Sequence, residues 1–190
     1  MSYEARRLLA PATKKTIGKK AAELTPDNSS LLINIGTTTE QVAHALKDHR
    51  GLLGITNNVN AVDIMKNFLS IELIIAGGQV RRFDGGIVGV AAVDFINQFK
   101  VDYAVIGVSA INEDGSLLDY DFRGVRVAQA IIENARHVIL VADIIKLECT
   151  APIRISHVSQ INTIVINAKL PWGLEKTCRE HGVLVVIAEE

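Results

Sequence analysis

Short apolar runs alternate along the chain with longer segments in which apolar residues recur at helical spacing. The runs predict strands at residues 31–35, 52–56, 71–76, 101–107, 137–142, 163–166 and 183–187. The spacing predicts helices over 13–24, 42–46, 61–68, 89–99, 121–135 and 171–182. Because strands rich in Val, Ile and Leu alternate with helices, we expect an α/β fold with a mainly parallel sheet covered by helices on both faces.

Glycine and polar residues gather directly after five of these predicted strands. They are Gly36-Thr37-Thr38-Thr39, Thr56-Asn57-Asn58, Gly77-Gly78 with Arg81 and Arg82, Gly107-Val108-Ser109, and Asp143 with Lys146. In parallel sheets, ligands bind beyond the carboxyl ends of the strands. The shared placement therefore favours a binding site for a small anion.

The residues Thr37 to Thr39 lie where the first predicted strand passes into a helix through Val42 and Leu46. One of the three threonines is expected to cap that helix, whose first N–H groups have no backbone partner. Free N–H groups, hydroxyls and the positive end of a helix dipole favour an anion at one point. The alternative is that the threonines only cap the helix.

The polar groups after the strands suit a phosphorylated sugar or polyol. Glycines let backbone N–H groups approach a ligand, and arginine or lysine adds charge-assisted contacts to phosphate. Neither GxxxxGK[ST] nor a GxGxxG after a strand occurs, which disfavours nucleoside triphosphates and dinucleotides. Simpler alternatives remain: Gly77-Gly78 as a turn, Asp143 and Lys146 as a surface ion pair, and Asn57 and Asn58 as helix caps.

Enzyme chemistry is possible at this edge but is not indicated by a motif. Acidic residues are available at Glu113, Asp119, Asp121 and Asp143, and Lys146 could act on a carbonyl. No GxSxG elbow and no HExxH pair is present. We therefore predict a binding protein without catalytic residues.

The composition, with 190 residues, 48% apolar residues and a formal net charge of -1, predicts one globular domain with one core. No apolar run approaches the ~20 residues of a membrane span, so a cytoplasmic location is expected. Cys149 and Cys178 form no CxxC pattern, and the histidines lack metal-site spacing. No disulfide, metal or cofactor is predicted.

The N-terminal residues 1–12 are polar and predict a linker. The following helix, Thr13 to Leu24, has Ile17 and Ala21 on one side and carries Lys14, Lys15, Lys19 and Lys20. Lysines spread over the outer face of a helix are usually solvated, so we do not expect this segment to contact DNA.

Taken together, these segments resemble the effector-sensing domain of DeoR-type bacterial transcriptional repressors. The resemblance extends from about residue 3 to residue 187 and rests on the order and spacing of the polar clusters, with Asp102-Tyr103-Ala104-Val105-Ile106-Gly107 and Ala142-Asp143 among them. Gly85 to Gly89 and Asp119 to Arg123 are most similar to the glycerol-3-phosphate regulon repressor branch. The implied fold is that of ribose-5-phosphate isomerase, glucosamine-6-phosphate deaminase and CoA transferases.

The resemblance implies a sensor that binds a phosphorylated sugar or polyol, with glycerol 3-phosphate as the leading candidate, and forms a homo-oligomer. Operator DNA would be bound by a winged helix-turn-helix that is missing before residue 13, with residues 1–12 as linker and 13–190 as sensor. The phosphate would lie at Thr37 to Thr39 near Lys146 and Arg82. The predicted ligand-binding residues are Gly36, Thr37, Thr38, Thr39, Thr56, Asn57, Asn58, Gly78, Arg82, Gly107, Asp121, Asp143 and Lys146.

Three positions depart from the family pattern. Asn34 replaces a usual aspartate, Gly124 a common acid, and Ile145 a frequent serine or threonine. The loss of acids makes catalysis less favourable. A sugar-phosphate isomerase or deaminase of the same fold remains the alternative, and a dimerisation module with a decayed pocket is a third.

Overall fold

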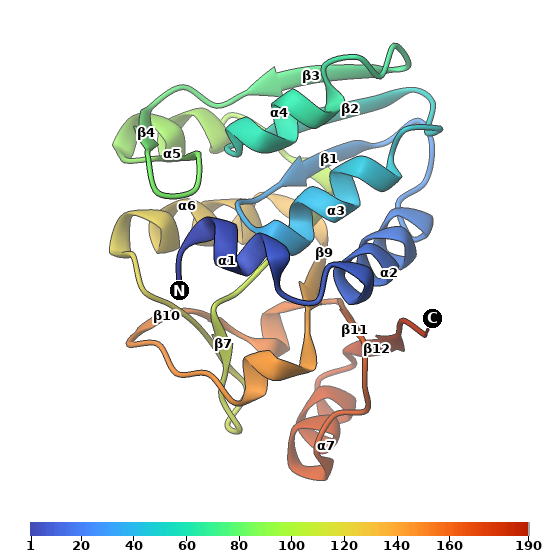
Figure 1. Ribbon diagram of the computed structural model, residues 1–190, viewed down its shortest axis with the longest axis vertical. Coiled ribbons are helices and arrows are strands. Elements are labelled where there is room, and N and C mark those ends of the chain that lie inside the picture. The colour runs from blue at the N-terminus through green and yellow to red at the C-terminus, as the bar shows by residue number, and fades with distance from the viewer. Residues whose placement is uncertain (190) are drawn as a thin grey trace.

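The computed structural model describes residues 1–189 and contains a seven-stranded parallel sheet (Figure 1). Its strand order is β12-β11-β9-β6-β1-β2-β3, and every neighbouring pair is parallel. The bounds are β1 (Ser30–Ile33), β2 (Leu52–Thr56), β3 (Ile71–Ile75), β6 (Val101–Ile106), β9 (Ala135–Ala142), β11 (Thr163–Ile166) and β12 (Leu184–Ile187). The predicted fold class and strands are thus confirmed, with ends shifted by at most about two residues.

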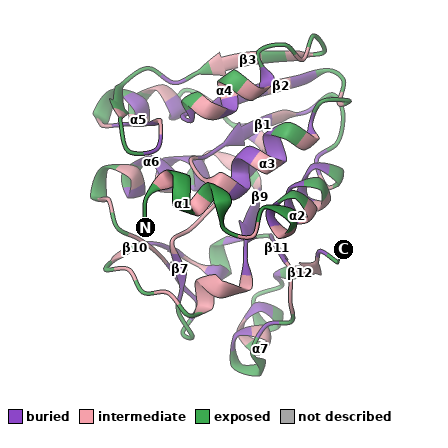
Figure 2. Ribbon diagram, in the orientation of Figure 1, coloured by how far each residue is buried: buried purple, intermediate pink, exposed green. Residues whose placement is uncertain are grey.

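Helices cover both faces of this sheet, because the strand residues are apolar on both sides. On strand β1, Leu31 and Ile33 belong to one core cluster and Leu32 to the other. The first cluster includes residues of α2 (Pro11–Glu23), α3 (Thr37–Ala45) and α4 (Val59–Met65), and the second includes residues of α5 (Val90–Ile96), α6 (Phe122–Glu133) and α7 (Trp172–Glu180). Figure 2 shows buried residues concentrated in the strands and on the inner faces of these helices. Burial of each such Leu or Ile stabilises the fold by roughly 1.5–3 kcal/mol.

Several short elements escape prediction because they contain only two to five residues and no apolar run. They are a hairpin of β4 (Gln79–Arg81) and β5 (Gly86–Val88), an antiparallel sheet of β7 (Ala110–Ile111), β8 (Ser116–Asp119) and β10 (Ile153–His157), and the 3-10 helices η1 (Ile144–Leu147) and η2 (Val158–Gln160). The predicted turn at Asp84 to Gly86 connects β4 to β5. This hairpin returns the chain toward the carboxyl end of β2, where Asn58 bridges to Gly86.

The N-terminal segment contains a short helix, α1 (Tyr3–Leu8), where the sequence predicts a polar linker. Ser2 caps this helix by accepting a hydrogen bond from the N–H of Ala5, and α2 begins at Pro11. No residue of α1 is buried. The helix lies beside α3 (Figure 1), where the hydroxyl of Tyr3 donates to the carboxylate of Glu40 at 2.7 Å.

Helices α2 and α3 pack with their backbones in close approach at Gly18. A Cβ atom at Gly18 would lie 2.5 Å from the carbonyl carbon of Gln41. Only glycine allows this separation. Ile17 and Ala21 beside it are fully buried, so the contact forms part of the core.

The strand order places a topological switch point between β1 and β6. From β1 the chain proceeds to β2 and β3 on one side, while β6, β9, β11 and β12 follow on the other. Connections leave β1 and β6 in opposite directions, which opens a crevice at their carboxyl ends. Within residues 1–189, no helix is both long and apolar enough to cross a membrane.

Candidate functional site

A cavity of about 970 Å³ lies at this switch point. Its walls come from the loops after β1, β6 and β9, the β4–β5 hairpin, the start of α6 and the N-terminal segment. The predicted residues that line it are Gly36, Thr37, Thr38, Thr39, Gly107, Asp121, Asp143 and Lys146. Its size is within the range of small-molecule sites.

The wall after β1 is the N-terminal end of α3. The N-cap is Gly36, and no side chain caps the helix, so the predicted threonine cap is wrong. Thr39 instead donates its hydroxyl to the carbonyls of Asn34 and Gly36, each at 2.8 Å. The hydroxyls of Thr37 and Thr38 make no hydrogen bond to the part of the chain that the structure describes. The first-turn N–H groups and these hydroxyls are therefore available to an anion.

Asn34 lines the cavity with a buried amide oxygen that has no hydrogen-bond partner within residues 1–189. The residue is 5% exposed. An unpartnered buried acceptor is costly unless a ligand or water supplies a donor. A hydroxyl group of a ligand would satisfy it. The sequence marks Asn34 as a departure from the family but does not place it among the ligand-binding residues.

Lys146 and Asp143 do not form the surface ion pair considered from the sequence. Asp143 is buried and accepts a hydrogen bond from the N–H of Ile145 at 3.1 Å, which caps η1. Lys146 lines the cavity, and among residues 1–189 no carboxylate lies within ion-pair distance of its ammonium. Burial lowers the pKa of Lys146. The ammonium is therefore a cation that an anionic ligand would stabilise.

Arg81 is one of the arginines that line the cavity, whereas the sequence selects Arg82. Arg82 is exposed and lies outside the lining, so its predicted position is wrong. Adjacent residues of a strand point to opposite sides, and Arg81 ends β4 opposite Gly86. Without the hairpin, the sequence gives no reason to choose between the two.

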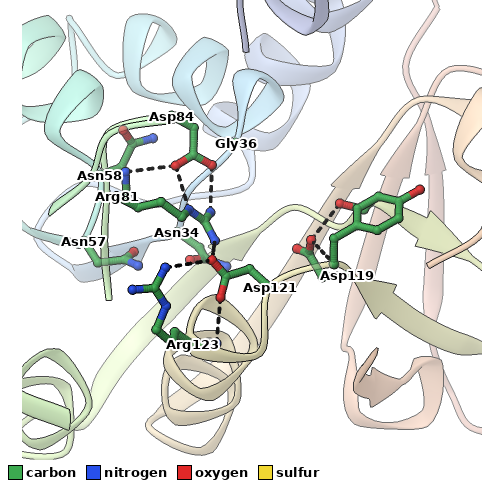
Figure 3. A network of polar contacts seen from close by, with 12 residues as sticks. Asn34, Gly36, Asn57, Asn58, Arg81, Asp84, Asp119, Asp121 and Arg123 are labelled. Carbon is green, nitrogen blue, oxygen red and sulfur yellow. Dashed lines mark hydrogen bonds and ion pairs between the residues drawn. The ribbon is translucent and has the colours of Figure 1, made fainter. Parts of the chain in front are cut away.

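Arg81 is held between two carboxylates (Figure 3). Its Nε and Nη2 donate to Asp84 at 2.9 and 2.7 Å, and its Nη1 lies 2.9 Å from the carboxylate of Asp121. Burial opposes the charge, but these hydrogen bonds raise the pKa of Arg81. Burial likewise acts to raise the pKa of Asp121, yet the hydrogen bonds from Arg81 and from the N–H of Arg123 lower it. The hydrogen bonds of Arg81 to both carboxylates fix the position of its guanidinium.

Gly124 provides the space for this arginine. A Cβ at Gly124 would lie 2.8 Å from Nη1 of Arg81. We expect Gly124→Ala to lower the free energy of unfolding by about 1–2 kcal/mol, because the pinned guanidinium must move. The higher helix propensity of alanine would by itself stabilise the helix by up to ~1 kcal/mol. Urea denaturation therefore separates the clash from the propensity, because the two change the free energy of unfolding in opposite directions. A gain in stability would contradict the steric role of Gly124.

The polar residues after β2 support the hairpin and lie outside the cavity lining. Thr56 donates its hydroxyl to the carbonyl of Ile33 at 2.6 Å, and Asn57 donates to the carbonyl of Ile87 at 3.2 Å. Asn58 caps α4, the alternative considered from the sequence. Gly78 also lies outside, where a Cβ would meet the side chain of Ile87 at 2.9 Å. These four predicted residues are brought near the site but do not face it.

The carboxylates that line the cavity all have protein partners. Asp84 and Asp121 bind Arg81, and Asp143 caps η1. Asp119 accepts the hydroxyl of Ser109 at 2.8 Å and the N–H of Tyr120 at 2.7 Å. A general base needs a lone pair that faces the substrate. Within residues 1–189, the contacts use both oxygens of Asp84 and of Asp121, whereas Asp119 and Asp143 use Oδ1 alone.

Besides Arg81, sequence reasoning misses three cations of the lining, which are Arg6, Lys14 and Arg123. Lys14 is 5% exposed, so its prediction as a solvated lysine is wrong. The signal is present in the spacing, since Lys14 precedes Ile17 by three positions and Ala21 by seven, and therefore lies on the apolar face of α2. Because Lys14 is charged, it is not recognised as a member of the apolar repeat.

Comparison with known proteins identifies relatives along most of the chain. The DeoR C terminal sensor domain family matches residues 10–168. The glycerol-3-phosphate regulon repressor of Escherichia coli K12 is 41% identical over 170 residues, which cover 90% of this chain and 68% of that protein. The glycerol-3-phosphate regulon repressor of Haemophilus influenzae is 40% identical over 185 residues, which cover 97% of this chain and 72% of that protein.

A ribose-5-phosphate isomerase solved in complex with phospho-erythronic acid has the same fold. It aligns to 72% of this chain with a TM-score of 0.53 and 17% identity, and the chain spans about half, 54%, of its length. At this identity the likeness shows the fold alone. The family match and the identity to the two repressors go further, and they confirm the resemblance seen in the sequence: the chain belongs to the DeoR C-terminal sensor domain family.

Proposed function

We propose that this domain senses a phosphorylated sugar or polyol, with glycerol 3-phosphate as the leading candidate. The observation that carries the proposal is the cavity wall at the start of α3. There the hydroxyls of Thr37 and Thr38 and the ammonium of Lys146 have no hydrogen-bond or ion-pair partner among residues 1–189. A phosphate group would bring negative charge to the ammonium and several acceptor oxygens to the hydroxyls and the N–H groups of the helix. The names of the two repressors support the choice of glycerol 3-phosphate.

The remainder of the ligand would extend toward neutral and acidic acceptors. The unpartnered amide oxygen of Asn34 would accept a hydrogen bond from a hydroxyl, and Asp119 and Asp121 line the same cavity. Asp143 and Gly107 stay in the proposed site, whose lining does not include Thr56, Asn57, Asn58 or Gly78. A ligand with an anionic end and a hydroxylated end therefore fits better than a purely apolar one.

Signalling would be a shift in population between two states of a repressor. Operator DNA would be bound by a winged helix-turn-helix joined to this domain through residues 1–12, and the repressor would act in the cytoplasm as a homo-oligomer. Effector binding would relieve repression. The names of the two relatives support regulation of transcription.

The alternative from another class is a sugar-phosphate isomerase or deaminase of the same fold. It needs a carboxylate that is free to move a proton, whereas Asp84 and Asp121 both bind Arg81. Turnover of ribose 5-phosphate or glucosamine 6-phosphate by the pure protein would favour the enzyme over the sensor.

The test is calorimetric titration with a panel of phosphorylated sugars and polyols. We expect one member to bind, and Lys146→Met to weaken its binding by about 10- to 100-fold, since a hydrogen bond to a charged group contributes roughly 1.5–3 kcal/mol. Lys176→Met is the matched control, because Lys176 lies on α7, where it pairs with Glu180 outside the cavity.

Thr38→Val is expected to weaken binding of the same compound by a smaller factor, because a neutral hydrogen bond contributes about 1 kcal/mol. Absence of binding across the panel by a folded protein would overturn the sensor proposal. A stable oligomer without any binding would instead favour the dimerisation module with a decayed pocket.

A further inference from the structure

The side chain of Lys14 reaches the cavity from α2 and is almost fully buried. Its Nζ donates a hydrogen bond to the carbonyl oxygen of Arg6, and in residues 1–189 no carboxylate lies within ion-pair distance of it. Burial, followed by the positive charge of Lys146, lowers the pKa of Lys14, while Asp143 partly offsets both. A buried ammonium that has one carbonyl partner and a cationic neighbour is poorly stabilised in the free protein.

Arg6 adds a third cation to the same wall. Its Nη2 lies 3.7 Å from the carboxylate of Asp84, which is longer than a hydrogen bond. The same carboxylate is already bound by Arg81 at 2.7 Å. The Nε of Arg6 is buried and has no hydrogen-bond partner in the described part of the chain. The positive charge of Arg6 also acts to lower the pKa of both Lys14 and Lys146. The three cations therefore repel one another in a partly desolvated space.

Helix α1, which carries Arg6, is only weakly attached. It has six residues, none of them buried, and a helix of that length is unstable by itself. Its contacts are those of Arg6, the hydrogen bond from Tyr3 to Glu40, and the guanidinium of Arg6 above the ring of Phe83 at 5.2 Å. Met1, Ser2, Arg6 and Leu9 all line the cavity. Residues 1–9 thus form one wall of the cavity with little apolar burial to hold it.

We propose that Arg6 and Lys14 complete the phosphate site with Lys146, so that α1 closes onto a bound dianion. This inference rests on the proposed function and adds two ligand-binding residues from the N-terminal segment. An anion with two negative charges attracts each of the three cations, and at hydrogen-bond distance this attraction outweighs their mutual repulsion. The same ligand would therefore be held by α1, α2, α3 and η1, and would fix the position of the chain's first residues.

The test uses the 190-residue chain and inorganic phosphate as the probe. Trypsin cleaves after Arg6 and Arg7, and the rate of that cleavage reports how long α1 is undocked. We expect phosphate to slow the cleavage about tenfold, relative to potassium chloride of equal ionic strength, with the fragments identified by mass spectrometry. Unchanged or faster cleavage at saturating phosphate would overturn the inference.

Lys14→Met should abolish the protection by phosphate, and Lys15→Met is the matched control because Lys15 is the exposed neighbour on the same helix. Arg6→Gln, assayed by cleavage after Arg7, keeps the test decisive if Lys14→Met does not fold, because α1 contributes no buried residue. Protection retained in a folded Lys14→Met or in Arg6→Gln would contradict the assignment of that residue. The proposed function fails separately, if no phosphorylated sugar or polyol binds more tightly than inorganic phosphate.

Discussion

Gly18→Ala is expected to lower the free energy of unfolding by about 1–3 kcal/mol, as overpacked cores usually do. The added Cβ would lie 2.5 Å from the backbone of Gln41, and backbone atoms of a packed helix cannot move away as a flexible side chain does. Helices α2 and α3 would have to separate, which uncovers Ile17 and Val42, both fully buried. Without a clash, alanine would stabilise the helix by ~1 kcal/mol relative to glycine. A decrease in the free energy of unfolding would therefore show that the added Cβ clashes with Gln41.

Gly173→Ala is the matched control for this substitution. Gly173 also lies in a helix, α7, and apart from its chain neighbours and the backbone of that helix, no atom of residues 1–189 lies within 4 Å of the position that its Cβ would take. We expect Gly173→Ala to be neutral or stabilising by up to ~1 kcal/mol in urea denaturation. Equal effects of the two substitutions would show that α2 and α3 do not approach as closely as the structure has them.

Asp84→Ala is expected to cost about 3 kcal/mol of stability and to disorganise the cavity wall. Asp84 is buried and accepts two hydrogen bonds from Arg81 and one from the N–H of Gly86 at 3.2 Å. Removing one partner of a buried pair typically costs 3–5 kcal/mol, since the other charge is left without compensation. The lower value applies because Arg81 keeps its contact with Asp121.

Asp63→Ala provides the control for the loss of a carboxylate. Asp63 forms an ion pair with Lys66 three residues later in the chain, and its side chain is 75% exposed. We expect no measurable change in the denaturation midpoint for this variant. If Asp84→Ala unfolds at the same urea concentration as Asp63→Ala, the Arg81 pair does not stabilise the hairpin.

The parallel sheet was predictable because its strands are short, mainly apolar segments, and most residues of the central strands are buried. The cavity wall at Gly36 to Thr39 was predictable because the chain passes there from a predicted strand into a predicted helix, which places these residues at the carboxyl end of the sheet. The role of Thr39 was not, because whether a hydroxyl caps a helix or donates to a carbonyl depends on the local backbone path.

The misplaced residues have separate causes. Strand order cannot be read from a hydrophobic pattern. Thr56 ends β2 and Asn58 follows it, but β2 lies one position away from the switch point between β1 and β6. The sequence favours Arg82 over Arg81 because it gives no sign of the hairpin of three-residue strands. Lys14 escapes prediction because a charged residue at a buried position breaks the apolar repeat that marks such positions.

The position of β1 in the middle of the sheet also affects how the chain acquires its structure during synthesis. Leu31 pairs with Tyr103, and α2 contacts β9 and β11, so the earliest large helix packs on strands that are made late. Such distant pairings fold slowly. On the ribosome, α3 can pack on α2 early, but the part of α2 that contacts β9 and β11 stays uncovered until Thr163–Ile166 has emerged. A nascent chain of this domain therefore presents a substrate for chaperones throughout most of its translation.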